Sequence, residues 1–292
     1  MDIINGSQKT KYVFSGHESF QCKSLWLKKG YDFVFSNKDF SVPSAVVDLG
    51  VGKNMVSAIR FWLRAFGLTE NDELQRISHY IFNQEKGKDP YIEDLGTLWL
   101  LHYLLVSSGI ASVYQLTFIE FHKERNEFDK DQLQGFIKRK CSDSSYSNIY
   151  NENTVRKDIG VLLQNYVAPS TQKSNEDFSV LLLELNLITQ LDNKDLDRKT
   201  YTFNTIGKRR ITQEILLYAI IDKKGNDMTV SFESLLELSL LFCLSTTELI
   251  ETIKELVNSY PNILVYKDDG GIRQLHFLGE LDKFEVLENH FK

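Results

Sequence analysis

The chain has 292 residues, of which 42% are hydrophobic and 25% are charged. This composition is ordinary for a globular protein and excludes a wholly disordered or fibrous chain. The net charge of −6 would argue against a nucleic-acid partner if it were evenly spread. However, residues 1–83 hold 10 basic and 8 acidic residues, whereas residues 169–292 hold 14 and 20. The acidity therefore belongs to the last third, and the first third is net basic.

The cysteines and the apolar runs indicate the cellular compartment of the protein. Cys22, Cys141 and Cys243 are far apart and form no C-x-x-C pair, so we expect neither a disulfide scaffold nor a cysteine zinc site. There is no run of about 18 apolar residues, and the first residues show no signal-peptide pattern. We therefore expect a cytoplasmic protein that does not interact with a membrane.

In chain order, the first third predicts three helices, over residues 22–36, 42–50 and 53–68. A Gly-Val-Gly turn at 50–52 separates the short second helix from the longer third one, which is the arrangement of a helix-turn-helix. Residues 68–82 are then expected to form a β-wing.

The other two thirds predict a similar order of elements. Helices are expected over residues 95–108, 128–141, 151–167, 211–222, 231–241 and 245–260. Asn153 or Thr154 would cap the third of these, and Ser245 with Glu248 would form a capping box on the last. The two β-rich runs of 262–278 flank Asp269-Gly270-Gly271, which predicts a hairpin.

These elements predict a mainly α fold with small β-wings, built of tandem winged-helix (helix-turn-helix) modules. The modules are predicted over residues 1–83, 84–168 and 169–292, with a polar boundary at 168–179. The first would be a winged-helix-like DNA-binding module, and the second would be helical and winged-helix-like. The third would serve protein interaction or dimerisation.

The predicted helix 53–68 has two distinct faces. A core stripe recurs at helical spacing, formed by Met55, Ile59, Trp62 and Phe66. The outward face presents cations, a hydroxyl and an amide, from Lys53, Asn54, Ser57, Arg60 and Arg64. Such groups suit phosphate contacts and base edges, so we predict DNA binding here, with a merely solvated basic surface as the alternative.

Two further helices differ in charge. The outward side of 151–167 includes Asn153, Arg156 and Lys157, for which DNA contact and plain surface both remain open. The outward side of 245–260 is acidic, with Glu248, Glu251 and Glu255, and a phosphate backbone would be repelled there. That helix is expected to bind a protein or to form a homodimer. In the alternative, this module touches DNA only through its wing, with Lys267 and Arg273.

The sequence carries no evident cofactor site. A glycine-rich phosphate loop and paired-histidine metal spacing are absent. His102 lies in an apolar helix and is expected to be a hydrogen-bonded core histidine. No metal ligand is predicted, and a divalent metal is compatible with the chain if it is a nickase.

One short segment, 13–26, gathers groups that could do chemistry. His17, Glu18 and Lys23 supply a base, an acid and a cation, which suit phosphodiester cleavage. In the alternative interpretation, Ser15 or Ser19 caps the next helix while Glu18 interacts with its dipole.

Five blocks, over residues 14–32, 49–68, 89–105, 153–167 and 176–188, resemble a bacterial family of formerly unknown function. Its members typically lie beside phosphoadenosine-phosphosulfate-reductase-like proteins and include the SspB component of Ssp-type DNA phosphorothioation defence systems. The resemblance implies a DNA-directed role in sulfur modification of the backbone, with nicking by SspB-type members. Its matching blocks carry over His17, Glu18, Lys53 and Asn54. At position 23 this chain has Lys, where members more often carry Arg.

The sequence thus predicts a DNA-binding component of a phosphorothioate-modification system that nicks one strand. Its expected partners are DNA and the sulfur-transfer and ATPase-like proteins of the same system. A non-enzymatic winged-helix adaptor or transcriptional regulator would present the same basic face. A protein–protein scaffold would use that face to contact an acidic partner.

Overall fold

The computed structural model describes residues 12–142, 150–169, 179–191 and 198–292. These residues are mainly helical and carry small antiparallel sheets, which confirms the mainly α class. The longer helices contribute apolar side chains to one core cluster that runs along the chain from Cys22 to Leu287. Tandem winged-helix modules remain a prediction.

The N-terminal region contains α1 (Trp26–Phe35), α2 (Ala45–Leu49), α3 (Lys53–Ala65) and α4 (Arg76–Phe82). The predicted short helix, glycine turn and longer helix are present as α2 and α3. Strands β1 (Thr69–Glu70) and β2 (Glu73–Leu74) form a small hairpin where a wing was expected. The remainder of the predicted wing is helical instead, because Gln75 and Ser78 form a capping box that begins α4.

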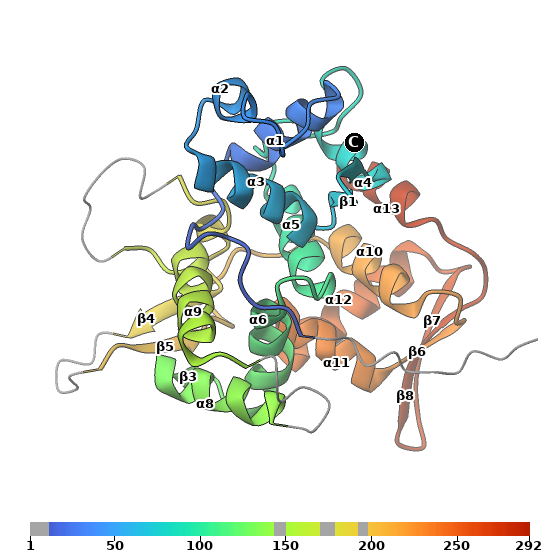
Figure 1. Cartoon of the computed structure of the whole chain (residues 1–292). Coiled ribbons are helices and arrows are strands. Elements are labelled where there is room, and N and C mark those ends of the chain that lie inside the picture. Colours follow the sequence, from blue (N-terminus) through green and yellow to red (C-terminus); the bar gives the residue numbers. More distant parts are fainter. Residues whose placement is uncertain (1–11, 143–149, 170–178, 192–197) are drawn as a thin grey trace, which may run out of the picture.

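The central region begins with α5 (Leu95–Ser107), which lies in the middle of the molecule (Figure 1) and is buried along most of its length. It continues through α6 (Ser112–Gln115), η1 (Leu116–Phe121), α7 (His122–Glu124), α8 (Lys130–Cys141) and α9 (Glu152–Tyr166). The predicted cap of α9 was wrong. Asn151 caps it, because its side-chain oxygen accepts a hydrogen bond from the Thr154 amide at 3.0 Å.

A three-stranded sheet joins the central region to the last third. Strand β5 (Thr200–Phe203) pairs on one side with β4 (Ile188–Leu191) and on the other with β3 (Glu127–Phe128). The short helix η3 (Leu183–Leu185) precedes this sheet. Because β3 and β5 come from different predicted modules, the second and third modules share a sheet. The division into three modules remains a prediction.

The C-terminal region contains α10 (Gln213–Lys224), α11 (Phe232–Leu241), α12 (Thr246–Ser259) and α13 (Lys283–His290). Its sheet has the order β6 (Thr229–Ser231), β8 (Ile272–Phe277), β7 (Leu264–Asp269), so the predicted hairpin is confirmed. The capping box of Ser245 and Glu248 on α12 is confirmed as well.

The last helix, α13, returns to the N-terminal region (Figure 1). The rings of Tyr80 and Phe284 pack edge to face with centroids 5.3 Å apart, and Lys88 Nζ lies 2.7 Å from a carboxylate oxygen of Glu288. The first and last parts of the described chain are therefore packed against each other.

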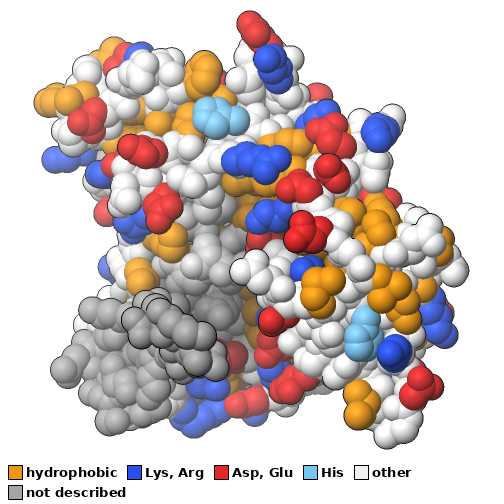
Figure 2. All heavy atoms as spheres, turned by 90° about the vertical axis from the view of Figure 1, so that its right-hand side faces the viewer, with side chains coloured by type: hydrophobic (Ala, Val, Ile, Leu, Met, Phe, Trp, Pro, Cys, Tyr) orange, Lys and Arg blue, Asp and Glu red, His pale blue; other side chains and the backbone are white. Residues whose placement is uncertain are grey.

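On the face that carries α13 and the hairpin β7–β8, acidic and basic side chains alternate (Figure 2). Among the described residues on that face, charges of the two signs are intermixed and neither sign forms a broad patch. In the described residues, no single helix has the length and hydropathy to cross a membrane. The segments Leu95–Ser107 and Ser112–Glu124 together have the length and composition of a membrane span, but the chain bends by 102° between them.

Candidate functional site

Helix α3 has the orientation predicted from its periodicity. It begins after Gly50, whose φ of +62° ends α2 in the left-handed conformation, and after the extended residue Gly52. Ile59, Trp62 and Phe66 are buried and Met55 is half-buried. The predicted contact residues are all exposed: Lys53, Asn54, Ser57, Arg60 and Arg64.

One cation of this face is already paired. Arg60 donates two hydrogen bonds to the Asp72 carboxylate, with Nε–Oδ1 at 2.9 Å and Nη2–Oδ2 at 2.5 Å. Asp72 and Asn71 form the turn of the β1–β2 hairpin, and both have a positive φ, as a tight hairpin turn of this type requires. The hydrogen bonds from Arg60 to Asp72 raise the pKa of the guanidinium. The exposed face is therefore less basic than the sequence suggests.

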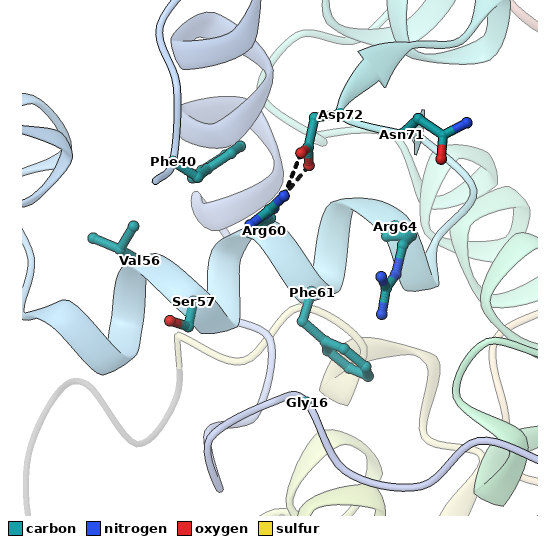
Figure 3. Close-up of a pocket in the computed structure, with 9 residues that line it drawn as sticks. All are labelled: Gly16, Phe40, Val56, Ser57, Arg60, Phe61, Arg64, Asn71 and Asp72. Carbon is teal, nitrogen blue, oxygen red and sulfur yellow. Dashed lines mark hydrogen bonds and ion pairs between the residues drawn. The ribbon is translucent and has the colours of Figure 1, made fainter. Parts of the chain in front are cut away.

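A cleft of about 580 Å³ lies along this face. Polar groups of Ser57, Arg60, Arg64, Asn71 and Asp72 line it together with apolar surface from Gly16, Phe40, Val56 and Phe61. Phe61 and Arg64 extend from α3 toward the backbone at Gly16, whereas Arg60 extends toward Asp72 (Figure 3). The cleft thus joins the predicted DNA-binding face to the segment that holds the predicted catalytic residues.

His17 is buried between two helices that the sequence linked to DNA. Its Nε2 lies 2.9 Å from Asp158 Oδ1 of α9, and its ring stacks on Trp62 of α3 with centroids 6.2 Å apart. Its Nδ1 accepts a hydrogen bond from the Ser19 amide at 3.1 Å, so the ring proton lies on Nε2 and is donated to Asp158. Both ring nitrogens are engaged in this conformation.

The loop over residues 15–19 has an unusual backbone. Four of its five residues have positive φ: Ser15 (76°), Gly16 (109°), Glu18 (49°) and Ser19 (65°). For the three of these residues that carry a Cβ, such conformations cost about 1–3 kcal/mol each and persist where the surroundings hold them. Here the Asp158 carboxylate holds the loop at two residues, because its Oδ1 accepts from His17 and its Oδ2 accepts from the Ser15 amide at 2.8 Å.

The other two predicted catalytic residues lie differently. Glu18 is exposed at the tip of the 15–19 loop. Lys23 is half-buried and forms an antiparallel bridge with Val180. Within the described residues, the hydrogen-bond partners of the His17 ring are the Asp158 carboxylate and the Ser19 backbone amide, and neither Glu18 nor Lys23 is among them.

The alternative in which this segment caps a helix was wrong. Helix α1 begins at Trp26 after Leu25, with no side-chain cap and no acidic residue in its first turn. Ser15 and Ser19 lie several residues before it and belong to the 15–19 loop.

Sequence reasoning missed two residues of α9 that organise this site. Asp158 holds the loop, and Asn165 accepts from the Cys22 amide at 3.0 Å while its own amide donates to the Tyr114 hydroxyl at 2.7 Å. Both side chains are buried. A signal was present, because Asp158 falls beside the core positions Val155 and Ile159, where an unpaired carboxylate would be costly.

The predicted DNA contacts of α9 lie on the surface, and the predicted core histidine of α5 is buried. Asn153, Arg156 and Lys157 are exposed, and Arg156 Nη2 lies 3.7 Å from an Asp131 oxygen. His102 is the expected core histidine: Nδ1 and Nε2 contact the Tyr166 hydroxyl at 2.7 Å and the Leu241 carbonyl at 2.8 Å. Burial lowers its pKa to about 4.

The acidic side of α12 is partly neutralised by the segment before α10. Glu248 pairs with the buried Lys208 at 3.0 Å, and Glu255 pairs with Arg210 at 3.2 Å. In α12 itself, the pKa of Glu248 is lowered by hydrogen bonds from Ser245 and Lys208, against the effect of burial. A homodimer or protein contact through this helix remains a prediction.

Comparisons with known proteins agree with this architecture. The profile of a family described as a protein of unknown function, DUF4007, matches residues 14–291. The fold is similar to that of a magnesium ion-bound SspB crystal structure and of an SspB crystal structure, with TM-scores of 0.82 and 0.80. Both are 26% identical, over 96% of this chain and 88% of theirs. Comparison with curated protein sequences gave no match.

The magnesium ion belongs to the first of those structures. Among the residues described for this chain, no group of three or more His, Cys, Asp or Glu side chains lies together as a metal cage. In proteins, a magnesium ion usually keeps several water ligands and is bound through only one or two carboxylates.

Proposed function

The chain belongs to the DUF4007 family, and on this basis we propose that it is the DNA-directed component of an Ssp-type phosphorothioation system. It binds the DNA backbone through the exposed face of α3 and nicks one strand beside the 15–19 loop. Likeness to SspB supports the system. The observation that carries the DNA-directed part is the cleft in which the exposed cations of α3 and this strained loop meet.

The binding step follows from charge. Within the described residues, Lys53 and Arg64 are exposed and form no ion pair, so both are available to phosphates. The N-terminus of α3 adds to them, because Gly52 provides no side-chain cap and the first turn has no acidic residue. Its free backbone amides and the positive end of the helix dipole favour a phosphate at the same place as Lys53.

The nicking step would be a hydrolysis. The oxygen of a water molecule forms a bond to phosphorus while a phosphorus–oxygen ester bond of the backbone breaks. Glu18, exposed at the tip of the loop, accepts the proton of the water, and the leaving oxygen takes a proton from solvent. Arg64 neutralises charge on the phosphate. His17 has no free nitrogen and acts by holding the loop through Asp158.

A second candidate function is a non-enzymatic DNA-binding adaptor or regulator. The observation that favours it is the engagement of both nitrogens of the buried His17, which leaves Glu18 as the single predicted acid–base group at the loop surface. An adaptor would use the same α3 face and would hold the loop rigid for packing alone.

A plasmid assay separates these two functions. Purified protein is incubated with supercoiled plasmid, with added Mg²⁺ or with a chelator, and open-circle product is measured. The nickase proposal expects open circle from the wild type and none from Glu18→Gln, which keeps the shape of the side chain. Wild-type protein that binds plasmid without nicking it under either condition would refute the nickase and leave the adaptor.

The binding face is tested with a matched pair of charge reversals. Lys53→Glu/Arg64→Glu should lose at least about ten-fold in affinity for duplex DNA, and the salt slope should fall by about one unit per lost phosphate contact. The control, Lys86→Glu/Lys254→Glu, changes the net charge equally at exposed positions outside α3. Equal losses in both variants would show that net charge, and not the α3 face, sets the affinity.

The remaining parts of the proposal concern the setting. The sulfur-transfer and ATPase-like proteins would be separate partners, located with this protein in the cytoplasm. Exposed positions of α9, Asn153 and Lys157, would add contacts to the DNA backbone. The C-terminal region would contact a protein partner or a second copy of the chain.

A further inference from the structure

The cleft lies beside the face of α3 that a DNA-recognition helix would insert into a groove. A helix that reads a duplex enters the major groove, about 12 Å wide, and needs its outward face clear on both sides. Here Ser57, Arg60 and Arg64 line a cavity of about 580 Å³ instead. The Asn71–Asp72 turn bounds it on one side and the backbone at Gly16 on the other (Figure 3). The exposed side chains of this face therefore open into a cleft beside α3, which offers a DNA strand a recess as well as a surface.

The lining suits a smaller part of a DNA strand. Phe40, Val56 and Phe61 provide apolar surface, the Asn71 amide and the Ser57 hydroxyl can hydrogen-bond, and Arg64 supplies a cation. Proteins that take unstacked bases combine these features, with rings for the base and cations for the phosphate. The cavity volume also lies within the range of about 300–1,000 Å³ of small-ligand sites.

The position of the cleft relates it to the 15–19 loop. Phe61, on its wall, packs edge to face against the His17 ring with centroids 5.7 Å apart, and a Cβ at Gly16 would lie 2.4 Å from a ring carbon of Phe61. A nucleotide against Phe61 would therefore direct its backbone past the loop that carries Glu18.

We propose that this cleft binds a single unstacked nucleotide of a DNA strand, with its base against Phe61 and its phosphate at Arg64. The proposal rests on the proposed function, because it names the part of the DNA that the same site takes. The protein then selects DNA by the ease with which one nucleotide leaves the stack, and not by inserting α3 into a groove.

The test compares two labelled duplexes of equal length and sequence, one fully paired and one with a single unpaired thymidine. Fluorescence anisotropy gives the affinity of the full chain for each. The key variant is Ser57→Trp, which fills the cleft from an exposed position without changing any charge, and Ser57→Ala is its matched control. A third titration with thymidine monophosphate tests binding of a free nucleotide.

We expect the wild type and Ser57→Ala to bind the duplex with the unpaired thymidine at least about ten-fold more tightly. Ser57→Trp should lose this preference, so that it binds the two duplexes with equal affinity. Equal wild-type affinities overturn the cleft proposal and leave the proposed function standing. A preference that survives in Ser57→Trp also overturns it, since the nucleotide would then bind elsewhere. Saturable binding of thymidine monophosphate without any preference between duplexes would assign the cleft to a free nucleotide, and no binding of any DNA would refute both proposals.

Discussion

Substituting Gly16 by Ala tests whether the 15–19 loop is held in its strained form by contact with α3. The φ of Gly16 is +109°, which residues with a side chain rarely adopt. An added Cβ would lie 2.4 and 2.7 Å from two ring carbons of Phe61. Ordinary carbon contacts are about 3.5–4.0 Å, so the ring would have to move by roughly 1 Å.

The expected cost has two parts. The left-handed backbone costs about 1–2 kcal/mol for a residue with Cβ, and overpacking costs about 1–3 kcal/mol, so Gly16→Ala should lose about 2–5 kcal/mol. Two other glycines separate these parts. Gly50 has φ +62° and open space around it, so Gly50→Ala should lose about 1–2 kcal/mol. Gly160 lies within α9 with open space, so Gly160→Ala should gain about 1 kcal/mol.

Urea unfolding of the three variants, followed by circular dichroism, gives the free energies of unfolding. Gly16→Ala should be the least stable, and it should also lose nicking or DNA binding, since Phe61 forms the wall of the cleft. A loss no greater than that of Gly50→Ala would refute the close contact between Gly16 and Phe61. A gain like that of Gly160→Ala would refute the strained loop altogether.

Three further results are expected. Burial lowers the pKa of His102 to about 4. As pH falls from about 6.5 to 4, the unfolded chain therefore binds a proton at this residue while the folded chain does not, and the free energy of unfolding should fall by about 3 kcal/mol. If His102→Gln loses as much stability in acid as the wild type does, measured by urea unfolding, this explanation is wrong. Asp72→Asn frees Arg60 from its ion pair and should raise duplex affinity about five-fold, or ~1 kcal/mol, in an anisotropy titration; unchanged affinity would mean that Arg60 does not face the DNA. Asp158→Asn leaves one acceptor for two N–H donors and should lose about 2–3 kcal/mol in urea, together with any nicking; wild-type stability would show that the loop does not depend on this carboxylate.

Local patterns were enough to predict most of the long helices, although not α4 or α13, and the outward face of α3. The positions of Lys53, Ser57, Arg60 and Arg64 follow from helical periodicity, which depends on neighbouring residues alone. The capping box at Ser245 and the hairpin at Gly270 are local too. The wing predicted over residues 68–82 was too long. This stretch holds both a short hairpin and a helix that starts at Arg76, and its apolar spacing is mixed.

The parts that sequence could not supply depend on contacts far along the chain. His17 and Asp158 are 141 residues apart, so nothing near His17 reveals that its nitrogens are engaged. The pairing of Arg60 with Asp72 was closer at hand, at a separation of 12, but it required the turn at Asn71 and Asp72 to be placed. Charged residues on one helix face therefore predict reliably that this face is exposed. They predict less reliably that its cations are free of ion pairs.

The return of α13 to α4 has a consequence for how the protein folds. Lys88 and Glu288 are 200 residues apart, and closing so long a segment is entropically costly and slow. On the ribosome, α4 leaves the exit tunnel long before its partner helix is made, and Tyr80 has no Phe284 to pack against until then. Synthesis of nearly the whole described chain thus precedes completion of the N-terminal region, so fragments cut near residue 168 should need each other to reach the native state.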